Sequence, residues 1–170
     1  MITEFLSEEN IALHKEYVRQ KRLKLSIIES YLPRLAGINA EHIHSLRLDK
    51  KDKADVLALL PEITLHEVYF SSFAKEENLH SETVTDIYGS DAAFLNRLYR
   101  AAVNSRYGFL TVGRDASFAV VTDYPRAFVG GAPALAVDLC EHAYFLDYGF
   151  DRERYILSCL SHLDLRKITT

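Results

Sequence analysis

The sequence predicts an α+β protein, in which an N-terminal α-helical hairpin is followed by an α/β domain with a three-stranded antiparallel sheet. Apolar residues recur at helical spacing in the first half of the chain, and short apolar runs between turn residues fill positions 109–139. Helices followed by clustered strands are typical of α+β folds. We therefore expect a helical hairpin domain at residues 1–84 and an α+β domain at residues 85–170.

The first predicted helix begins after Ser7. A serine can cap a helix, and the two glutamates that follow it suit the positive end of the helix dipole. One face of the helix then carries apolar residues and a histidine at spacings of three, four and seven, namely Ile11, His14, Val18 and Leu25.

The next long helix is predicted to begin at Pro61, because proline is favoured in the first turn of a helix. The polar stretch 42–55 before it is interpreted as a turn and the entry to a short helix. A further helix is predicted over residues 90–104, and Asp151 is expected to cap the final one. The inward face of the helix at Pro61 would carry Ile63, His66, Phe70 and Phe73.

Three short extended runs predict the sheet. Residues 109–112 and 117–122 flank the turn residues 113–116 and together are typical of a β-hairpin. A third run at 134–139 follows the Gly- and Pro-containing turn 130–133.

Composition excludes several classes of protein. The chain has 170 residues, of which 48% are apolar and 26% charged, as in ordinary globular domains. The net charge of −4 disfavours a nucleic-acid binder, and no apolar run is long enough to span a membrane. The first residues lack the pattern of a secretory signal, and two cysteines, Cys140 and Cys159, make no disulfide framework. A cytoplasmic location is therefore expected.

Two histidines and one strand end are candidates for chemistry. His14 and His66 lie on apolar faces of separate predicted helices, whereas a single buried histidine is usually just hydrogen-bonded to the backbone. Asp138 ends an apolar strand, and His142 follows four residues later, a spacing that lets both side chains reach one point. Three imidazoles and one carboxylate would suit iron, manganese or zinc.

The same residues carry a family resemblance. The string DLCEHAYFLDY at 138–148 resembles the C-terminal signature of the iron/manganese superoxide dismutase family. LHEVYF at 65–70 resembles the second-helix motif of that family, and residues 6–14 resemble the opening of its first helix. The resemblance covers nearly the whole chain and implies one iron or manganese ion per subunit, bound by His14, His66, Asp138 and His142.

The resemblance also implies activity and assembly. It identifies the chain as a divergent member of a family that converts superoxide into O₂ and H₂O₂, with superoxide as its substrate. It implies a homodimer in which Glu141 bridges to the ligand histidine of the other subunit, because a carboxylate that accepts the free ring N–H fixes the tautomer of a metal-bound histidine. The alternative for Glu141 is a solvated surface residue.

Several family positions are changed. Where the family has a histidine and a channel tyrosine, one and two turns after the first ligand, this chain has Val18 and Arg22. The family's active-site glutamine is replaced by Glu62, one turn before His66, or falls near Asp123. An ionised carboxylate accepts hydrogen bonds but donates none, so this exchange alters the chemistry of the site. We take Glu62 and Arg22 as candidate catalytic residues.

Arg22 would act as a positive charge that attracts superoxide at the channel mouth, and the alternative is a solvated helix face. Tyr17 is interpreted as a packing residue, with replacement of the channel tyrosine as its alternative. The remaining histidines have no partner pattern and are expected at the surface; they are His42, His44, His80 and His162.

Two other functions remain open at this point. The changed positions favour a superoxide-dismutase-like protein that binds metal or serves in assembly with little or no dismutase activity. A zinc-dependent hydrolytic site is the other alternative, with Glu62 as its general base. The intact set of four ligand residues favours the dismutase.

Overall fold

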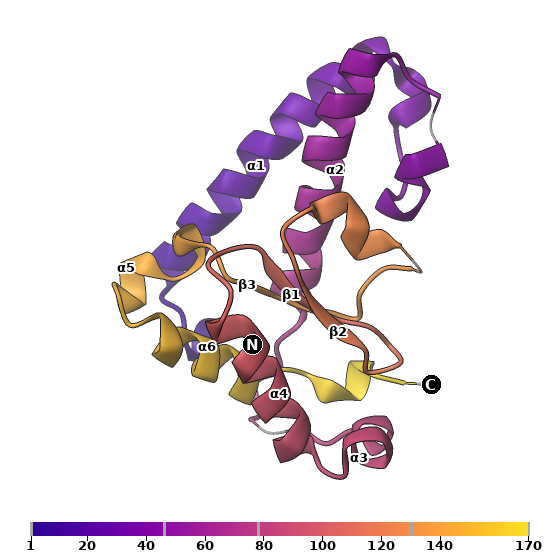
Figure 1. Cartoon of the computed structure of the whole chain (residues 1–170). Coiled ribbons are helices and arrows are strands. Elements are labelled where there is room, and N and C mark those ends of the chain that lie inside the picture. Colours follow the sequence, from indigo (N-terminus) through magenta and orange to yellow (C-terminus); the bar gives the residue numbers. More distant parts are fainter. Residues whose placement is uncertain (1, 46, 78, 130, 170) are drawn as a thin grey trace.

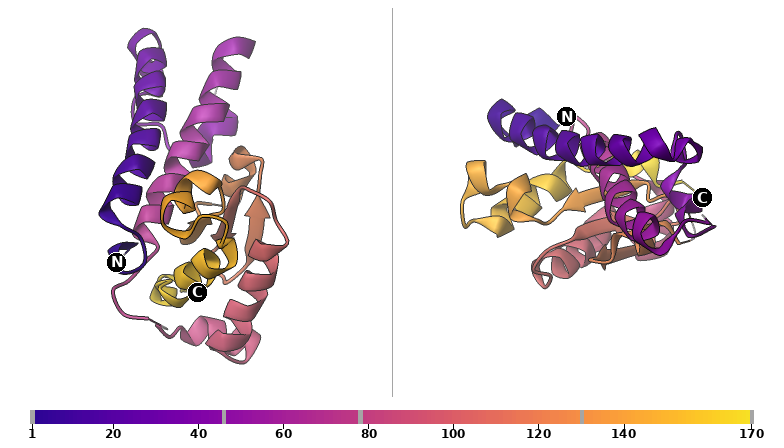
Figure 2. Two further views of the ribbon diagram at one scale, coloured as in Figure 1. Left: turned by 90° about the vertical axis from the view of Figure 1, so that its left-hand side faces the viewer. Right: turned by 90° about the horizontal axis from the view of Figure 1, so that it is seen from above.

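The computed structural model describes residues 2–45, 47–77, 79–129 and 131–169. Two long helices, α1 (Glu8–Tyr31) and α2 (Lys50–Ser71), pack side by side and project from the rest of the molecule (Figures 1 and 2). Further helices and a three-stranded antiparallel sheet follow. The predicted α+β class is confirmed.

Helix α1 begins where the sequence predicts. The Ser7 hydroxyl accepts a hydrogen bond from the backbone N–H of Asn10 at 3.1 Å, which satisfies one of the free donors of the first turn. The helix ends at Tyr31, shortly before Pro33, as the restriction of residues that precede proline requires. Its buried face includes the predicted residues Ile11, His14, Val18 and Leu25.

Helix α2 begins eleven residues before the predicted start, so the prediction from Pro61 was wrong. The Asp49 carboxylate accepts backbone N–H groups of Lys51 and Asp52 at 3.0 and 2.9 Å and caps the helix there. Pro61 lies buried inside the helix, at a cost in backbone hydrogen bonding. Packing of Val56 and other apolar residues against α1 outweighs that cost. The spacing of residues along the sequence does not reveal this packing.

The remaining helices surround the sheet. Helix α3 (Glu82–Tyr88) and helix α4 (Asp91–Val103) are capped by serines, and α5 (Phe145–Tyr148) leads into α6 (Arg152–Ser161). Asp151 caps α6 as predicted, since its side chain accepts the N–H of Arg154 at 3.1 Å. Short 3-10 helices are η1 (Ile2–Glu4), η2 (Pro33–Leu35), η3 (Ala40–Ser45), η4 (Tyr124–Phe128), η5 (Glu141–Ala143) and η6 (Leu165–Lys167).

The sheet consists of β1 (Phe109–Val112), β2 (Phe118–Val121) and β3 (Leu135–Asp138) in the order β2-β1-β3. Strand β1 pairs antiparallel with both neighbours, and its register sets Phe109 opposite Asp138. The Ser72 hydroxyl at the end of α2 accepts the backbone N–H of Ala136 at 2.8 Å. The end of β3 is therefore fixed both to β1 and to the long helix beside it.

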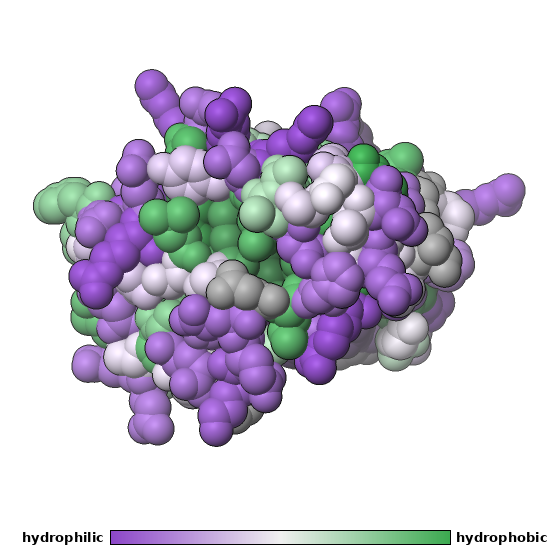
Figure 3. All heavy atoms as spheres, turned by 90° about the horizontal axis from the view of Figure 1, so that it is seen from below, coloured by the Kyte–Doolittle hydropathy of each residue, from purple (hydrophilic) through white to green (hydrophobic). Residues whose placement is uncertain are grey.

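Two apolar clusters hold these elements together. The smaller one joins α1 and α2 around Leu25, Ile28 and Val56. The larger one combines residues from both halves of the chain, including Tyr69, Phe94, Leu110, Leu139 and Tyr155. On the face opposite the tips of α1 and α2, apolar side chains line a central hollow framed by hydrophilic residues (Figure 3).

The domain boundary after residue 84 stays a prediction; it falls inside α3 (Glu82–Tyr88). Among the described residues, no helix combines the length and the apolar character needed to cross a membrane.

Gly108 provides a test of how β3 is held. Its carbonyl accepts the N–H of Leu139 at 2.8 Å, its φ is +105°, and a Cβ there would overlap the carbonyl oxygen of Val121. We expect Gly108→Ala to lower the free energy of unfolding by about 3 kcal/mol, since backbone strain and a clash add. Gly89, with φ +83° and open space around it, is the control.

Gly89→Ala should cost about 1 kcal/mol, because only the left-handed backbone is penalised there. Urea denaturation of both variants measures the two losses. Equal losses would show that close approach to Val121 does not constrain Gly108.

Candidate metal centre

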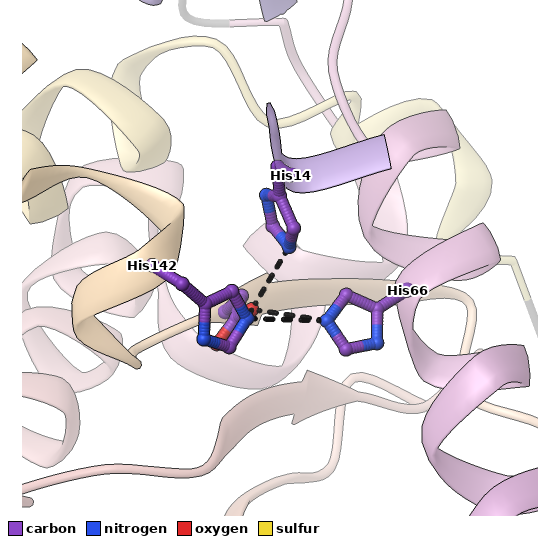
Figure 4. A group of neighbouring side chains, drawn as sticks. His14, His66 and His142 are labelled. Carbon is purple, nitrogen blue, oxygen red and sulfur yellow. Dashed lines mark hydrogen bonds and ion pairs between the residues drawn. The ribbon is translucent and has the colours of Figure 1, made fainter. Parts of the chain in front are cut away.

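Four side chains from four elements converge in the interior. They are His14 on α1, His66 on α2, Asp138 at the end of β3 and His142 on η5, and their ligand atoms all lie within 4.8 Å of one another. In Figure 4 the three histidines point toward a common centre. Residues far apart in the sequence thus form one compact cluster of nitrogen and oxygen donors.

One carboxylate oxygen is the centre of this cluster. Asp138 Oδ2 lies 3.2 Å from Nε2 of His14, 3.3 Å from Nε2 of His66 and 2.9 Å from Nε2 of His142. Asp138 is fully buried and His14 and His66 are each 1% exposed, whereas the His142 side chain is 30% exposed. The cluster is therefore closed on most sides and open along His142.

The chain fixes the orientation of Asp138 with two hydrogen bonds. The backbone N–H of Cys140 donates to Oδ1 at 2.9 Å, and the hydroxyl of Tyr155 donates to the Asp138 carbonyl at 2.8 Å. Tyr69 lies next in this chain, with its hydroxyl 3.2 Å from that of Tyr155. Because Oδ1 is occupied in this way, Oδ2 faces the three imidazoles.

The contact of His66 Nδ1 with the backbone determines which ring nitrogen carries the proton. Nδ1 lies 2.7 Å from the backbone carbonyl oxygen of Glu62. A carbonyl only accepts hydrogen bonds, so the proton of the neutral ring resides on Nδ1. Nε2 then turns its lone pair toward Asp138 Oδ2, 3.3 Å away. Two acceptors at that distance repel each other unless a cation or a proton lies between them.

Unpartnered buried atoms point to the same conclusion. Both ring nitrogens of His14 and Oδ2 of Asp138 are enclosed and have no hydrogen-bond partner among the described residues. An unsatisfied buried polar atom costs on the order of 1–3 kcal/mol, so a ligand that satisfies several at once is favoured. Three imidazole nitrogens and one carboxylate oxygen fit a single iron, manganese or zinc ion.

The protonation states also suit ligands. Burial lowers the pKa of His14, although the nearby Asp138 carboxylate opposes this, and the ring is neutral. Burial by itself would raise the pKa of Asp138, but the close contacts of its carboxylate with His14, His142 and His66 bring it well below its ordinary value. Neutral imidazole and ionised carboxylate are the forms that bind metal.

Comparison with known proteins places this chain in a family. Residues 75–170 match the C-terminal domain of the iron/manganese superoxide dismutases, which is more than half of the chain. The chain belongs to the iron/manganese superoxide dismutase family. The resemblance noted in the sequence is confirmed.

One curated relative is an iron superoxide dismutase of Cupriavidus metallidurans. It is 28% identical to this chain over 128 residues, which are 69% of this chain and 65% of the relative. The chain therefore spans somewhat less than two thirds of the length of the family member that it matches.

Glu62 lies beside the histidine cluster in this family member. Its side chain is 9% exposed, and its two carboxylate oxygens accept hydrogen bonds from the Tyr17 hydroxyl and the Lys21 ammonium, each at 2.7 Å. Asp123, the alternative position for the lost glutamine, is 60% exposed and paired with Arg126. Of the two positions, Glu62 is the one connected to the cluster, because its carbonyl contacts His66 and its carboxylate holds Tyr17, which stacks on His142.

Arg22 and Glu141 both lie at the surface. The Arg22 guanidinium forms an ion pair with Glu67, and both side chains are about half exposed, at 54% and 51%. Glu141 precedes His142 on η5 and is exposed. The catalytic role of Arg22 and the bridging role of Glu141 stay predictions.

Tyr17 packs against the histidine cluster. Its ring stacks on His142 with centroids 4.3 Å apart and an interplanar angle of 27°, and it lies 5.7 Å from the ring of His66. The spacing of three residues after His14 indicates that Tyr17 and His14 share a face of α1. Nothing in the sequence indicates that Glu62 would meet its hydroxyl, because that contact depends on how α1 and α2 pack.

The histidines predicted at the surface differ in their exposure to solvent. His80 is exposed and pairs with Asp91 at 2.6 Å. His162 is 7% exposed, donates from Nδ1 to the carbonyl of Ser158 at 2.9 Å and packs on Phe5, so that prediction was wrong. The side chain of His44 lies outside the described residues.

We expect His66→Ala to abolish metal binding, because it removes one of four donors from a site that needs all of them. Native protein should gain stability when iron or manganese is added, by about 4 kcal/mol at a metal concentration of about 1,000 Kd, whereas His66→Ala should gain none. Metal analysis and thermal unfolding with and without added metal measure both effects.

The matched control is His80→Ala, which removes an exposed imidazole far from the cluster. It should bind metal as the native chain does. Full metal occupancy in His66→Ala would contradict the ligand assignment.

Proposed function

We propose that this protein is a superoxide dismutase that converts superoxide into O₂ and H₂O₂ with one iron or manganese ion held by His14, His66, Asp138 and His142. The observation that carries the proposal is a buried cluster of three imidazoles and one carboxylate, with unpartnered atoms facing its centre, in a member of this family. Its free cysteines, Cys140 and Cys159, suit a reducing cytoplasm as the place of reaction.

When bound, iron or manganese would exchange one electron with each superoxide by alternating between the +2 and +3 states, so that two superoxide anions and two protons yield one O₂ and one H₂O₂. The protein would provide three neutral imidazoles and one carboxylate, which offsets part of the positive charge of the ion. The Glu62 carbonyl holds His66 in the tautomer whose Nε2 is free to bind.

Aromatic rings shield the cluster from water. Phe70 packs 5.0 Å from His14, and Phe109 packs 5.0 Å from His66. Tyr69 lies 5.1 Å from His14 on a third side. A dry surrounding strengthens the electrostatic effect of Asp138 on the ion and limits access to small solutes.

The charged residues near the cluster contribute differently. Arg22 is half exposed and paired with Glu67, so we propose that it adds to long-range attraction of the superoxide anion, an effect that salt screens. Glu62 has both carboxylate oxygens bonded, and we propose that it acts on the site through its neighbours. The same pairing already engages both oxygens of Glu62, which disfavours their use as the general base of a zinc hydrolase.

We also propose that the protein forms a homodimer through the region of Glu141. His142 is exposed at 30%, and we propose that its Nδ1, which forms no hydrogen bond with the described residues, donates to a carboxylate from a second copy. Large apolar side chains are exposed on the neighbouring elements, with Phe150 at 95% and Phe145 at 48%. Exposed apolar surface of this kind is typical of interfaces between protein chains.

The dismutase proposal is tested by loading purified protein with iron or with manganese and measuring superoxide consumption. We expect one or both loaded forms to exceed the metal-free protein by at least a hundredfold, because the uncatalysed step lacks the bound ion. His66→Ala is the control, since it should match the metal-free protein.

Activity equal to that of the metal-free protein in both loaded forms would contradict the dismutase. It would support the alternative of a metal-binding or assembly protein, which the changed positions Val18 and Arg22 favour.

The dimer is tested with Glu141→Gln, which removes the charge and keeps the shape of the side chain. Sedimentation at a series of concentrations should show a dissociation constant about tenfold or more higher than that of the native chain, because a charged hydrogen bond to histidine contributes roughly 1.5–3 kcal/mol. Asp86→Asn, on the distant helix α3, is the control. A monomeric native chain would contradict the proposal.

A further inference from the structure

Tyr17, Glu62 and Lys21 form one hydrogen-bonded unit between α1 and α2. Glu62 is nearly buried, and its oxygens accept from the Tyr17 hydroxyl and the Lys21 ammonium at 2.7 Å each. The Lys21 side chain is 25% exposed, and its nitrogen lies 4.9 Å from the centre of the Tyr17 ring. The Lys21 ammonium and the Glu62 carboxylate therefore form an ion pair of opposite charges between the two helices.

This unit adjoins the open side of the histidine cluster. The Tyr17 ring stacks on His142 at 4.3 Å, and His142 is the ligand candidate with substantial exposure, at 30%. The other three members of the cluster are at most 1% exposed. A solute that reaches the cluster along His142 therefore passes the edge of the Tyr17 ring.

We propose that Tyr17, Glu62 and Lys21 form the wall past which a small monoanion enters the site, and that the balance between the Lys21 and Glu62 charges sets the affinity of the site for that anion. The proposal deepens the proposed function and rests on it. The three side chains act as positioning residues: Lys21 holds Glu62, Glu62 holds the Tyr17 hydroxyl, and Tyr17 covers one face of His142.

The signs of the two charges predict how the removal of each one changes the affinity for an anion. Lys21 and Glu62 together add no net charge beside the site. Loss of the Lys21 charge alone would leave a buried carboxylate that repels an anion, and loss of the Glu62 charge alone would leave an ammonium that attracts it. By Coulomb's law, one unit charge about 10 Å from an anion, at an effective dielectric constant of about 20, changes the affinity for that anion roughly tenfold.

The test is titration of metal-loaded protein with azide, a small monoanion, followed by the absorption band that azide produces on ferric or manganic ions. Lys21→Met should weaken azide binding about tenfold, and Glu62→Gln should strengthen it. The double variant Lys21→Met with Glu62→Gln should return to within about threefold of the native chain. These opposite shifts and their cancellation are not expected of a merely structural role.

Lys24→Met is the matched control, because Lys24 is exposed on the same helix one turn away. It should leave azide affinity within about twofold of the native value. Lys21→Arg, which keeps the charge, should do so as well. Glu62→Gln keeps the shape of the side chain, so the sign of its effect decides the proposal even if Lys21→Met does not fold.

Equal azide affinity in the native chain and both single variants, or shifts in the same direction, would overturn the wall. Opposite shifts in a loaded protein without dismutase activity would support the wall and overturn the proposed function. Dismutase activity in a loaded protein without these shifts would support the proposed function and overturn the proposed wall. A native chain that retains neither iron nor manganese would overturn both.

Discussion

The structure depends on one electrostatic constraint: three imidazole nitrogens and one carboxylate oxygen are held together inside an apolar core. Asp138 Oδ2 lies within 3.3 Å of Nε2 of His14, His66 and His142. The Glu62 carbonyl fixes a lone pair of His66 toward that oxygen, so the arrangement repels itself without positive charge at its centre. Such a cluster is costly to bury unless it binds a cation, and binding then also stabilises the fold.

Each element of the fold contributes to that convergence. The paired helices α1 and α2 carry one histidine each, and the register of β1 with β3 brings Asp138 opposite Phe109, which packs on His66. Tyr155 and the backbone of Cys140 then orient Asp138 from behind. The hydrogen bond from Tyr155 lies in a fully buried position, where competing water is absent, and the one from Cys140 is partly buried.

The surroundings of the cluster depart from the family where the anion would enter. At a position where the family resemblance implies a glutamine, this chain has the Glu62 carboxylate, and a lysine and a tyrosine on the facing helix complete its bonding. A change of charge near a redox ion requires compensation nearby, and Lys21 lies where such compensation is effective. The wall of Tyr17, Glu62 and Lys21 is thus a self-consistent alternative, whereas Arg22 is paired with Glu67 at the surface.

The sequence by itself determined the fold class, the helix cap at Ser7, the strands and the four residues that converge, because local spacing and a family motif carry that information. It did not determine the start of α2, the burial of His162 or the partners of Glu62. Tertiary packing decided these: apolar contact with α1 outweighs the cost of Pro61 in a helix, and the approach of the two helices brings Tyr17 to Glu62, which lies 45 residues later in the chain. Residue spacing describes one element at a time, whereas such contacts depend on how elements pack against each other.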